Sequence, residues 1–303
     1  MEYPEKFKGI FPAIITPFKA NSDIDPETFE HLAARLYKAK VQGLFVGGNM
    51  GEWYTQTLQE RKHIAECAVA CSRGLGRTIL HVGCTRIEDA MELAAFGEKI
   101  GVDAIASLSP YSARLPEKDI VYYYRELARS TGLPVFVYYH PVLTGFHLTK
   151  GAVESIFSEL NIAGIKYTDY DLLTLTNLIG FQERRLHVFN GQDQVLFPAL
   201  LLGASGGIGS FYNIIPRAFV SLYQYNQEGN MAAARKLQDQ INEFIQMVKA
   251  YPLIPALKYI LHVNGTGTSV FRATMVALTE NEKRRLEHDL SNSEFFHAWR
   301  IER

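Results

Sequence analysis

The sequence predicts an α/β fold, a (β/α)8 TIM barrel followed by a C-terminal helical extension, and three observations support this prediction. Short apolar runs alternate with amphipathic stretches eight times, at a spacing of roughly 25 residues. No Pro- or Ser-rich linker interrupts the alternation, and from about residue 226 the pattern becomes purely helical. Apolar runs alternating with helices indicate a parallel sheet covered on its outer face, and eight such units close a barrel.

The apolar runs that we interpret as strands are 9–18, 43–48, 78–83, 104–108, 134–139, 162–166, 186–190 and 205–210. Amphipathic helices are predicted between and after them at 25–40, 58–73, 87–100, 117–131, 149–160, 172–181 and 194–202, and Pro216 begins the eighth. Asp25 is a candidate N-cap for the first helix, with Pro26 at its first position. An open doubly wound sheet is the alternative, but the first turn, 16–19, lacks the glycine fingerprint typical of that fold.

The pattern of the last part of the chain predicts three helices, at 231–250, 252–263 and 280–290. Pro252 and Pro255 predict a kinked connection between the first two of them. We expect them to pack against one side of the barrel rather than to form an independent domain. The predicted organisation is therefore a catalytic barrel over residues 1–225 and a helical region over residues 226–303.

The overall composition narrows the class of partner. Hydrophobic residues make up 47% and charged residues 21%, as in a globular protein, and the net charge of −1 offers no bulk attraction for nucleic acid or an anionic membrane. No apolar run is long enough to span a bilayer, and the first residues show no basic region followed by an apolar one. We therefore expect a cytoplasmic protein with neither kind of partner.

The cysteines and histidines favour neither a disulfide framework nor a metal site. Cys67, Cys71 and Cys84 are an odd, sparse set, which we interpret as reduced thiols. Cys67 and Cys71 lie four residues apart on a predicted helix, where packing is the simpler role. His81 and Cys84 are too isolated to indicate zinc.

A single lysine, Lys166, ends the sixth predicted strand. Burial at the end of a strand favours a neutral amine, which is a nucleophile that can form a Schiff base with a carbonyl substrate. The alternative is a lysine whose stem covers apolar surface while its ammonium group reaches water.

In a barrel the carboxyl ends of the strands meet at one mouth, where active sites are built. The groups predicted there are 48–52 after the second strand, Tyr138, Tyr139 and His140 on the fifth, Lys166 and Thr168 on the sixth, 190–194 on the seventh, and 206–210, Tyr212 and Asn213 on the eighth.

Tyr138 and the loop 48–52 complete a candidate site around Lys166. A phenol beside an amine suits Schiff-base chemistry, because it can accept or return a proton as the adjacent bond breaks. The glycines of the loop free backbone N–H groups to face an anion. A 2-keto acid carries both a ketone and a carboxylate, while the polar ends of strands seven and eight suit a polyhydroxylated tail.

Each member of this set has a simpler interpretation. Tyr138 can be a core aromatic residue, and Asp193 can cap the next helix. The glycines of 206–210 can form a tight barrel turn or a phosphate site. Glu52 is more often a carboxylate that braces a loop than a catalytic one. The combination is therefore more informative than any single residue.

Over essentially its whole length the chain resembles the class I aldolase superfamily that contains N-acetylneuraminate lyase and dihydrodipicolinate synthase. The resemblance rests on four motifs in order: Gly48-x-x-Gly51-Glu52, Tyr138-x-x-Pro141 running into Leu143-Thr144-Gly145, Gly164-Ile165-Lys166, and Gly206-x-Ile208-Gly209-Ser210-x-Tyr212-Asn213. It implies a barrel with a helical C-terminal region, a homotetramer, Lys166 as the Schiff-base lysine and Tyr138, rather than Tyr139, as the proton shuttle.

The resemblance also separates the branches of the superfamily. The synthase branch has an arginine where this chain has Leu143, which argues against synthase activity. The stretch from Lys166 to Leu173 is similar to the corresponding stretch of the animal-type sialic acid lyases. Within the superfamily, the chain therefore most resembles the N-acetylneuraminate lyase branch. The positions that match substrate contacts in those lyases are Thr168, Gly191, Asp193 and Ser210.

The chain departs from the family pattern at three places. Asn49 and Met50 replace a pair of hydroxyl residues, which removes one hydroxyl from the carboxylate site and one from the proton relay. Gln194 replaces an acidic residue that accepts from the substrate's glycerol tail. Tyr111, at a position often borrowed by a neighbouring subunit, is followed by Ser112 rather than a second tyrosine.

The expected function is the reversible aldol cleavage of N-acetylneuraminate to pyruvate and N-acetylmannosamine. Asn49, Met50 and Gln194 are counted with the substrate-binding residues. A pyruvate-forming aldolase for another 2-keto-3-deoxy sugar acid is the first alternative, and a non-catalytic barrel that binds a sugar acid is the second. Because the protonated imine is itself the electron sink, the resemblance implies neither a metal nor a cofactor.

Overall fold

The computed structural model describes residues 7–110, 114–181, 186–272 and 275–302. Eight parallel strands pair in the order β1-β8-β7-β6-β5-β4-β3-β2. The strands are β1 (Gly9–Pro12), β2 (Gly43–Val46), β3 (Arg77–His81), β4 (Ala104–Leu108), β5 (Val135–Tyr139), β6 (Ile162–Tyr167), β7 (His187–Asn190) and β8 (Gly206–Gly209). Between β1 and β2, Ala13 bridges Phe45 and the Ile14 N–H donates to the Phe45 carbonyl at 3.0 Å. This contact completes the ring, so the predicted barrel is confirmed.

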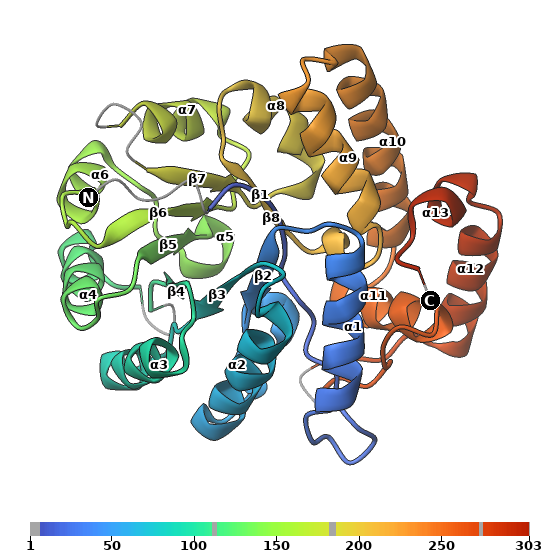
Figure 1. The fold of residues 1–303 in the computed structure, drawn as a ribbon, viewed down its shortest axis with the longest axis horizontal. Coiled ribbons are helices and arrows are strands. Elements are labelled where there is room, and N and C mark those ends of the chain that lie inside the picture. The colour runs from blue at the N-terminus through green and yellow to red at the C-terminus, as the bar shows by residue number, and fades with distance from the viewer. Residues whose placement is uncertain (1–6, 111–113, 182–185, 273–274, 303) are drawn as a thin grey trace.

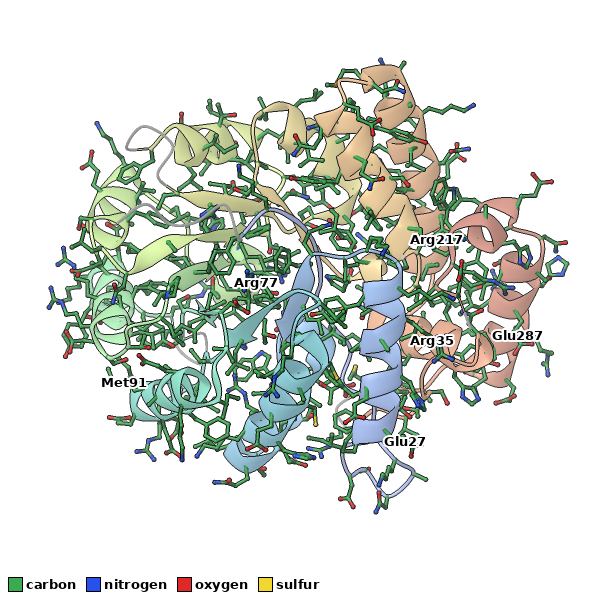
Figure 2. The ribbon with its side chains drawn as sticks, in the orientation of Figure 1. Glu27, Arg35, Arg77, Met91, Arg217 and Glu287 are labelled. Atoms are coloured by element: carbon green, nitrogen blue, oxygen red, sulfur yellow. The ribbon has the colours of Figure 1, made fainter. Side chains whose placement is uncertain are left out.

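Helices follow the strands and, apart from a short one directly after β5, cover the outer face of the barrel. They are α1 (Pro26–Lys38), α2 (Leu58–Ser72), α3 (Ile87–Ile100), α4 (Glu117–Arg129), α5 (Pro141–Thr144), α6 (Lys150–Phe157), α7 (Leu172–Gly180), α8 (Leu196–Leu201) and α9 (Pro216–Gln227). As predicted, Asp25 caps α1 by accepting from the Thr28 N–H at 3.2 Å, and Pro26 is its first residue. On α1, Phe29 and Leu32 are buried while Glu27 extends outward, as Figure 2 shows.

Most element boundaries differ from the prediction by one to three residues, and the end of the first strand differs by more. The first strand ends at Pro12 rather than at residue 18, because two prolines, Pro12 and Pro17, remove ladder donors from this run. The helix expected from residue 194 begins at Leu196, after a 3-10 turn over Asp193–Val195. The short helix α5 was not predicted, and it places the residues after β5 in a tight turn that ends at Gly145.

The glycines of β8 have a packing reason. A Cβ atom at Gly206 would lie 1.9 Å from the carbonyl oxygen of Gly9 on β1, so the two strands approach too closely for a side chain. Inside the barrel, Phe189 packs edge to face on Phe11, with ring centroids 5.2 Å apart, and meets Phe136 at a tilt, with centroids 5.9 Å apart.

The C-terminal helices α10 (Met231–Lys249), α11 (Leu253–Val263), α12 (Glu280–Ser291) and α13 (Glu294–Trp299) lie together to one side of the strands, orange to red in Figure 1. The division into residues 1–225 and 226–303 stays a prediction about domain organisation, and α9 spans residue 225. No helix among the described ranges combines the length and apolarity needed to cross a membrane.

Candidate active site

A cleft of about 880 Å³ opens where the strands β2, β5, β6, β7 and β8 end, beside the start of α11. All of the residues predicted for the site line it: Asn49, Met50, Tyr138, Lys166, Thr168, Gly191, Asp193, Gln194 and Ser210. They come from five separate strand ends, which the barrel brings to one place. Tyr111, by contrast, lies outside the described residues, as does Ser112.

Lys166 lies on β6 directly beside Tyr138 on β5, because the register of these parallel strands pairs the two residues. Its side chain is 4% exposed, and Nζ lies 3.8 Å from the ring centroid of Tyr138 and 4.3 Å from that of Phe45. Burial lowers the pKa of Lys166 to about 7, although the negative charge of Asp193 acts in the opposite direction. A substantial fraction of this lysine is therefore a neutral, nucleophilic amine near neutral pH.

Tyr138 is 3% exposed, and its ring meets those of Phe45 and His81 edge to face at 5.5 and 5.7 Å. Burial raises the pKa of its phenol, which keeps the hydroxyl protonated. The neighbouring Tyr139 stacks on Tyr167 at 5.2 Å and does not line the cleft. The alternation along β5 thus turns Tyr138 toward Lys166, in agreement with the choice of Tyr138 as the candidate proton shuttle.

The turn after β2 carries Asn49 and Met50, which begin the 3-10 turn Asn49–Gly51. Neither of their backbone N–H groups has an acceptor within the part of the chain that the structure describes. The indole N–H of Trp53 donates to Asn49 Oδ1 at 3.1 Å. Because an indole nitrogen only donates, this bond fixes the amide oxygen toward Trp53 and leaves the amide NH₂ as a donor.

Asp193, Ser210 and Gly209 form a second polar group on the opposite side of the cleft. Asp193 Oδ2 accepts from the Ser210 N–H at 3.1 Å, from Ser210 Oγ at 3.0 Å and from the Phe211 N–H at 2.9 Å. Its Oδ1 is buried without a partner among the described residues. Burial raises the pKa of Asp193, against these hydrogen bonds and the charge of Lys166. A Cβ at Gly209 would lie 1.9 Å from Oδ1, so only glycine leaves room for this carboxylate.

Thr168, Gly191 and Gln194 complete the predicted set. Thr168 follows β6, its Oγ1 is buried, and among the described residues that atom has no partner. A Cβ at Gly191 would lie 2.2 Å from the Thr168 hydroxyl oxygen, so the two residues meet only because Gly191 has no side chain. Gln194 Oε1 accepts from the Tyr170 hydroxyl at 3.0 Å, and the NH₂ group of this amide remains a donor at the cleft.

Sequence reasoning missed the part of the cleft that comes from the C-terminal helices. The lining residues from that region are Lys249, Pro252, Leu253, Ile254, Pro255, Met275 and Val276. Lining residues of the barrel without a predicted role include Trp53, Tyr54 and His140. His140 was placed at the mouth without a role, and burial lowers its pKa to about 4, so its imidazole is neutral. The contribution of α11 had no motif to signal it, because it depends on how the helices fold back onto the barrel.

The residues considered for a metal have other partners. His81 is fully buried, with Nδ1 2.8 Å from the Gly47 carbonyl oxygen, and Arg61 donates to Cys84 Sγ at 3.0 Å. Across the described ranges, no three His, Cys, Asp or Glu side chains are grouped so that they can share a metal ion.

Comparison with known proteins agrees with this geometry. The model of the dihydrodipicolinate synthetase family matches residues 6–293. The N-acetylneuraminate lyase of Enterobacter sp. (strain 638) is 30% identical over 263 residues, which cover 85% of this chain and 87% of that protein.

Two solved structures extend the comparison to the fold. The catalytic lysine mutant of the sialic acid aldolase of Ruminococcus gnavus has a TM-score of 0.92 and 27% identity, over 96% of this chain and 97% of that one. A prophage protein of the dihydrodipicolinic acid synthase family from E. coli K12 was solved in complex with pyruvate. It has a TM-score of 0.89 and 30% identity, over 94% of this chain and 98% of that one. The chain therefore belongs to the dihydrodipicolinate synthetase family.

Proposed function

We propose that the protein reversibly cleaves N-acetylneuraminate to pyruvate and N-acetylmannosamine through a Schiff base on Lys166. Membership of the family makes the chain an enzyme, a carbon–carbon lyase of the pyruvate-dependent class I aldolase type. The observation that carries the proposal is the buried Lys166 amine, whose pKa is lowered to about 7, in a cleft beside Tyr138. One similar protein has a catalytic lysine, and another was solved in complex with pyruvate. Both observations support the same chemistry.

In the proposed mechanism the neutral Lys166 amine attacks the ketone, and loss of water leaves a protonated imine. Tyr138 takes the proton of the C4 hydroxyl as the C3–C4 bond breaks, and the bonding electrons flow into the imine to form an enamine. The positive imine beside the ring favours the phenolate form that this step needs. Protonation of the enamine carbon restores the imine, and water then releases pyruvate from Lys166.

The turn after β2 is the proposed binding site for the substrate carboxylate. Three donors are available there, the N–H groups of Asn49 and Met50 and the Asn49 amide that Trp53 orients. Donors of this kind can replace the hydroxyls that the family pattern has at these two positions. Met50 cannot join a proton relay, so a water molecule or another hydroxyl has to pass on the proton that Tyr138 exchanges.

The remainder of the substrate is proposed to lie along Thr168, Gly191, Asp193, Gln194 and Ser210. Asp193 Oδ1 and Thr168 Oγ1, which have no partner in the part of the chain that the structure describes, can accept hydrogen bonds from substrate hydroxyls. Leu143 also lines the cleft, where the synthase branch has its arginine, and its apolar side chain offers nothing to a second carboxylate.

A pyruvate-forming aldolase for a shorter 2-keto-3-deoxy sugar acid is the second candidate. The Gln194 amide favours it, because it replaces the acidic acceptor of the family pattern with a neutral oxygen that already accepts from the Tyr170 hydroxyl. The non-catalytic barrel is disfavoured by the retention of both Lys166 and Tyr138 at contact distance.

Two experiments test the proposal. Borohydride reduction in the presence of pyruvate should add a stable mass to the peptide that holds Lys166, and no adduct there would refute the mechanism. A screen for pyruvate release from N-acetylneuraminate, N-glycolylneuraminate and keto-deoxy hexonates should then rank the substrates. Release only from the hexonates would replace the first candidate by the second.

We also propose, from the family resemblance and the composition, that the enzyme is a cytoplasmic homotetramer that needs no cofactor. Light scattering on the purified protein should give a mass about four times that of the chain of 34.2 kDa.

A further inference from the structure

A buried ion pair joins the C-terminal helices to the turn that carries Asn49 and Met50. Glu52, the residue after that turn, pairs through Oε1 with Lys258 Nζ of α11, and both side chains are 0% exposed. Lys258 Nζ also donates to the Val270 carbonyl at 2.9 Å and lies 4.3 Å from the ring centroid of Phe18. The pair therefore has no contact with solvent and links three segments that are distant in sequence.

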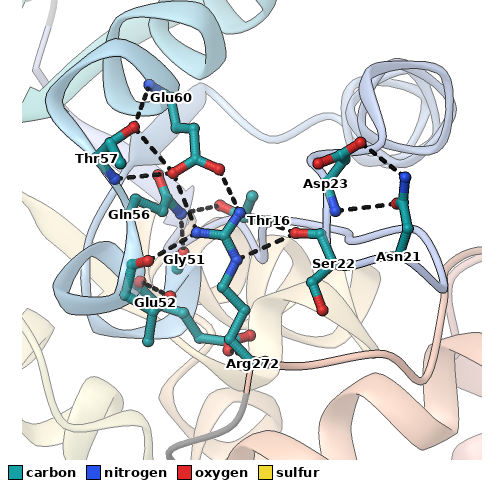
Figure 3. A network of polar contacts seen from close by, with 11 residues as sticks. Thr16, Asn21, Ser22, Asp23, Gly51, Glu52, Gln56, Thr57, Glu60 and Arg272 are labelled. Atoms are coloured by element: carbon teal, nitrogen blue, oxygen red, sulfur yellow. Dashed lines mark hydrogen bonds and ion pairs between the residues drawn. The ribbon is translucent and has the colours of Figure 1, made fainter.

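The second carboxylate oxygen of Glu52 is also held by the C-terminal region. It accepts the backbone N–H of Arg272 at 3.1 Å. Figure 3 shows the Arg272 guanidinium reaching past Glu52 to Glu60 and to the carbonyl of Ser22. Its Nη1 donates to the Thr55 carbonyl at 2.7 Å, so Arg272 fastens the chain on both sides of Glu52.

The other hydrogen bonds of the turn are local, including the one from the Trp53 indole to Asn49. Glu52 lies in the left-handed region with φ of 56°, and its N–H donates to the Asn49 carbonyl at 3.0 Å. Gln56 Nε2 donates to the Gly51 carbonyl at 2.6 Å, as Figure 3 shows. Asn49 and Met50 belong to no strand. The direction of their N–H groups thus depends on how Glu52 is anchored.

Lys258 connects this turn to the part of the cleft that α11 lines. Ile254, which lines the cleft, lies four residues before Lys258 on α11, so the two side chains share one face of the helix. We infer that the Glu52–Lys258 pair is a positioning device, which holds the Asn49–Met50 turn in the geometry that binds the carboxylate of a 2-keto acid. This inference rests on the proposed function and adds that the C-terminal region is part of the binding site.

The energetics of buried ion pairs supply a way to separate positioning from stability. Removing one partner leaves an uncompensated buried charge and destabilises the fold, whereas replacing both partners by uncharged residues is often close to neutral. The double variant Glu52→Gln/Lys258→Met should therefore unfold at a higher temperature than Lys258→Met alone. It should nevertheless fail to recover the geometry of the turn.

The test compares pyruvate with acetone, which has the ketone but no carboxylate. Borohydride trapping on the Lys166 peptide is measured against the concentration of each compound for the wild type, Lys258→Met, Glu52→Gln and the double variant. We expect the half-saturating pyruvate concentration to rise about tenfold in Lys258→Met and in the double variant, while acetone trapping stays within about twofold of wild type. The control is Lys62→Met/Glu92→Gln, which removes an ion pair of 2.5 Å between α2 and α3 on the outside of the barrel. It should leave the half-saturating pyruvate concentration and the acetone trapping unchanged.

The outcomes separate the two proposals. If the wild type gives no adduct at Lys166, the proposed function fails. If the wild type is labelled but the double variant is saturated by pyruvate as the wild type is, the positioning role is overturned. Equal losses of trapping with pyruvate and with acetone would also overturn it. A purely structural ion pair changes the amount of folded protein, and this lowers trapping of both compounds alike. Glu52→Gln keeps an oxygen that can accept the Arg272 N–H. The same comparison of pyruvate with acetone is made on this variant if Lys258→Met does not fold.

Discussion

The two walls of the cleft are built in different ways. On one wall, Lys166 and Tyr138 lie on adjacent strands whose backbone register pairs them directly, and the barrel buries both. On the other wall, Asn49 and Met50 lie on a turn that is anchored through Glu52 by Lys258 and Arg272, more than two hundred residues along the chain.

This difference divides the proposed reaction into separable parts. The strand wall has its chemistry tuned by burial, which lowers the pKa of Lys166 and raises that of Tyr138. The proposed role of the turn, binding the carboxylate, depends on the direction of its backbone N–H groups. Burial alone does not determine that direction. Changes in the strand wall should therefore affect bond making, and changes in the turn should affect the binding of the carboxylate.

The largest effect is expected for Lys166→Met, which removes the nucleophile from the strand wall. Activity should fall by at least about 10⁴-fold, measured as pyruvate release, and no adduct should form at this position. Because a buried amine is replaced by an apolar side chain of similar length, the unfolding midpoint at pH 7 should not fall and should rise by about 2 °C. A variant that keeps measurable turnover would show that another group forms the imine.

Tyr138→Phe separates imine formation from bond cleavage on the same wall. The ring that packs on Phe45 and His81 stays, while the proton-transferring hydroxyl is lost. We expect kcat for pyruvate release to fall about 10²- to 10³-fold, with trapping of pyruvate on Lys166 within a few-fold of wild type. Equal loss of trapping and cleavage would mean that Tyr138 mainly positions the lysine.

Asn49→Asp probes the opposite wall, by placing a negative charge where the carboxylate is proposed to bind. The half-saturating pyruvate concentration should rise about 10- to 100-fold, while acetone trapping at Lys166 should change little. Asn49→Ser, which restores a hydroxyl of the family pattern, is the control and should stay close to wild type. If pyruvate and acetone respond equally to Asn49→Asp, the carboxylate is bound elsewhere.

The pH dependence of trapping tests the electrostatics of the strand wall. The lowered pKa of Lys166, about 7, means that the reactive neutral amine predominates above pH 7 and is lost as the pH falls below it. The initial trapping rate with pyruvate should thus rise through pH 7 and level off, with about a tenfold decrease per pH unit on the acid side. A rate that keeps rising beyond pH 9 would indicate an unshifted lysine.

The smallest effect is expected at the rim of the cleft. In Gln194→Glu the Tyr170 hydroxyl can still donate, and the second carboxylate oxygen becomes an acceptor for a glycerol tail. KM for N-acetylneuraminate should fall about threefold, with pyruvate trapping unchanged. A fall in KM for a keto-deoxy hexonate instead would support the second candidate substrate.

Much of this molecule follows from local patterns in the sequence. The barrel strands are short buried runs, and helices such as α1 and α4 have one buried face, because the period of the apolar residues shows which face an element buries. Side-chain caps mark the starts of α1, α2, α6 and α7. The mouth of a barrel collects the strand ends, so the place of Lys166 on the sixth strand predicted a tyrosine of the fifth strand beside it. The family resemblance supplied the choice of Tyr138 and the role expected of Asp193.

The tertiary structure alone decided how those residues are held. The short turns, the stop of the first strand at Pro12 and the helix α5 depend on competing local contacts that a periodic pattern does not resolve. The pairing of Glu52 with Lys258, and the lining of the cleft by α11, join residues far apart in the chain. Such contacts leave no periodic signal, because burial and charge compensation are properties of the folded arrangement and not of either segment.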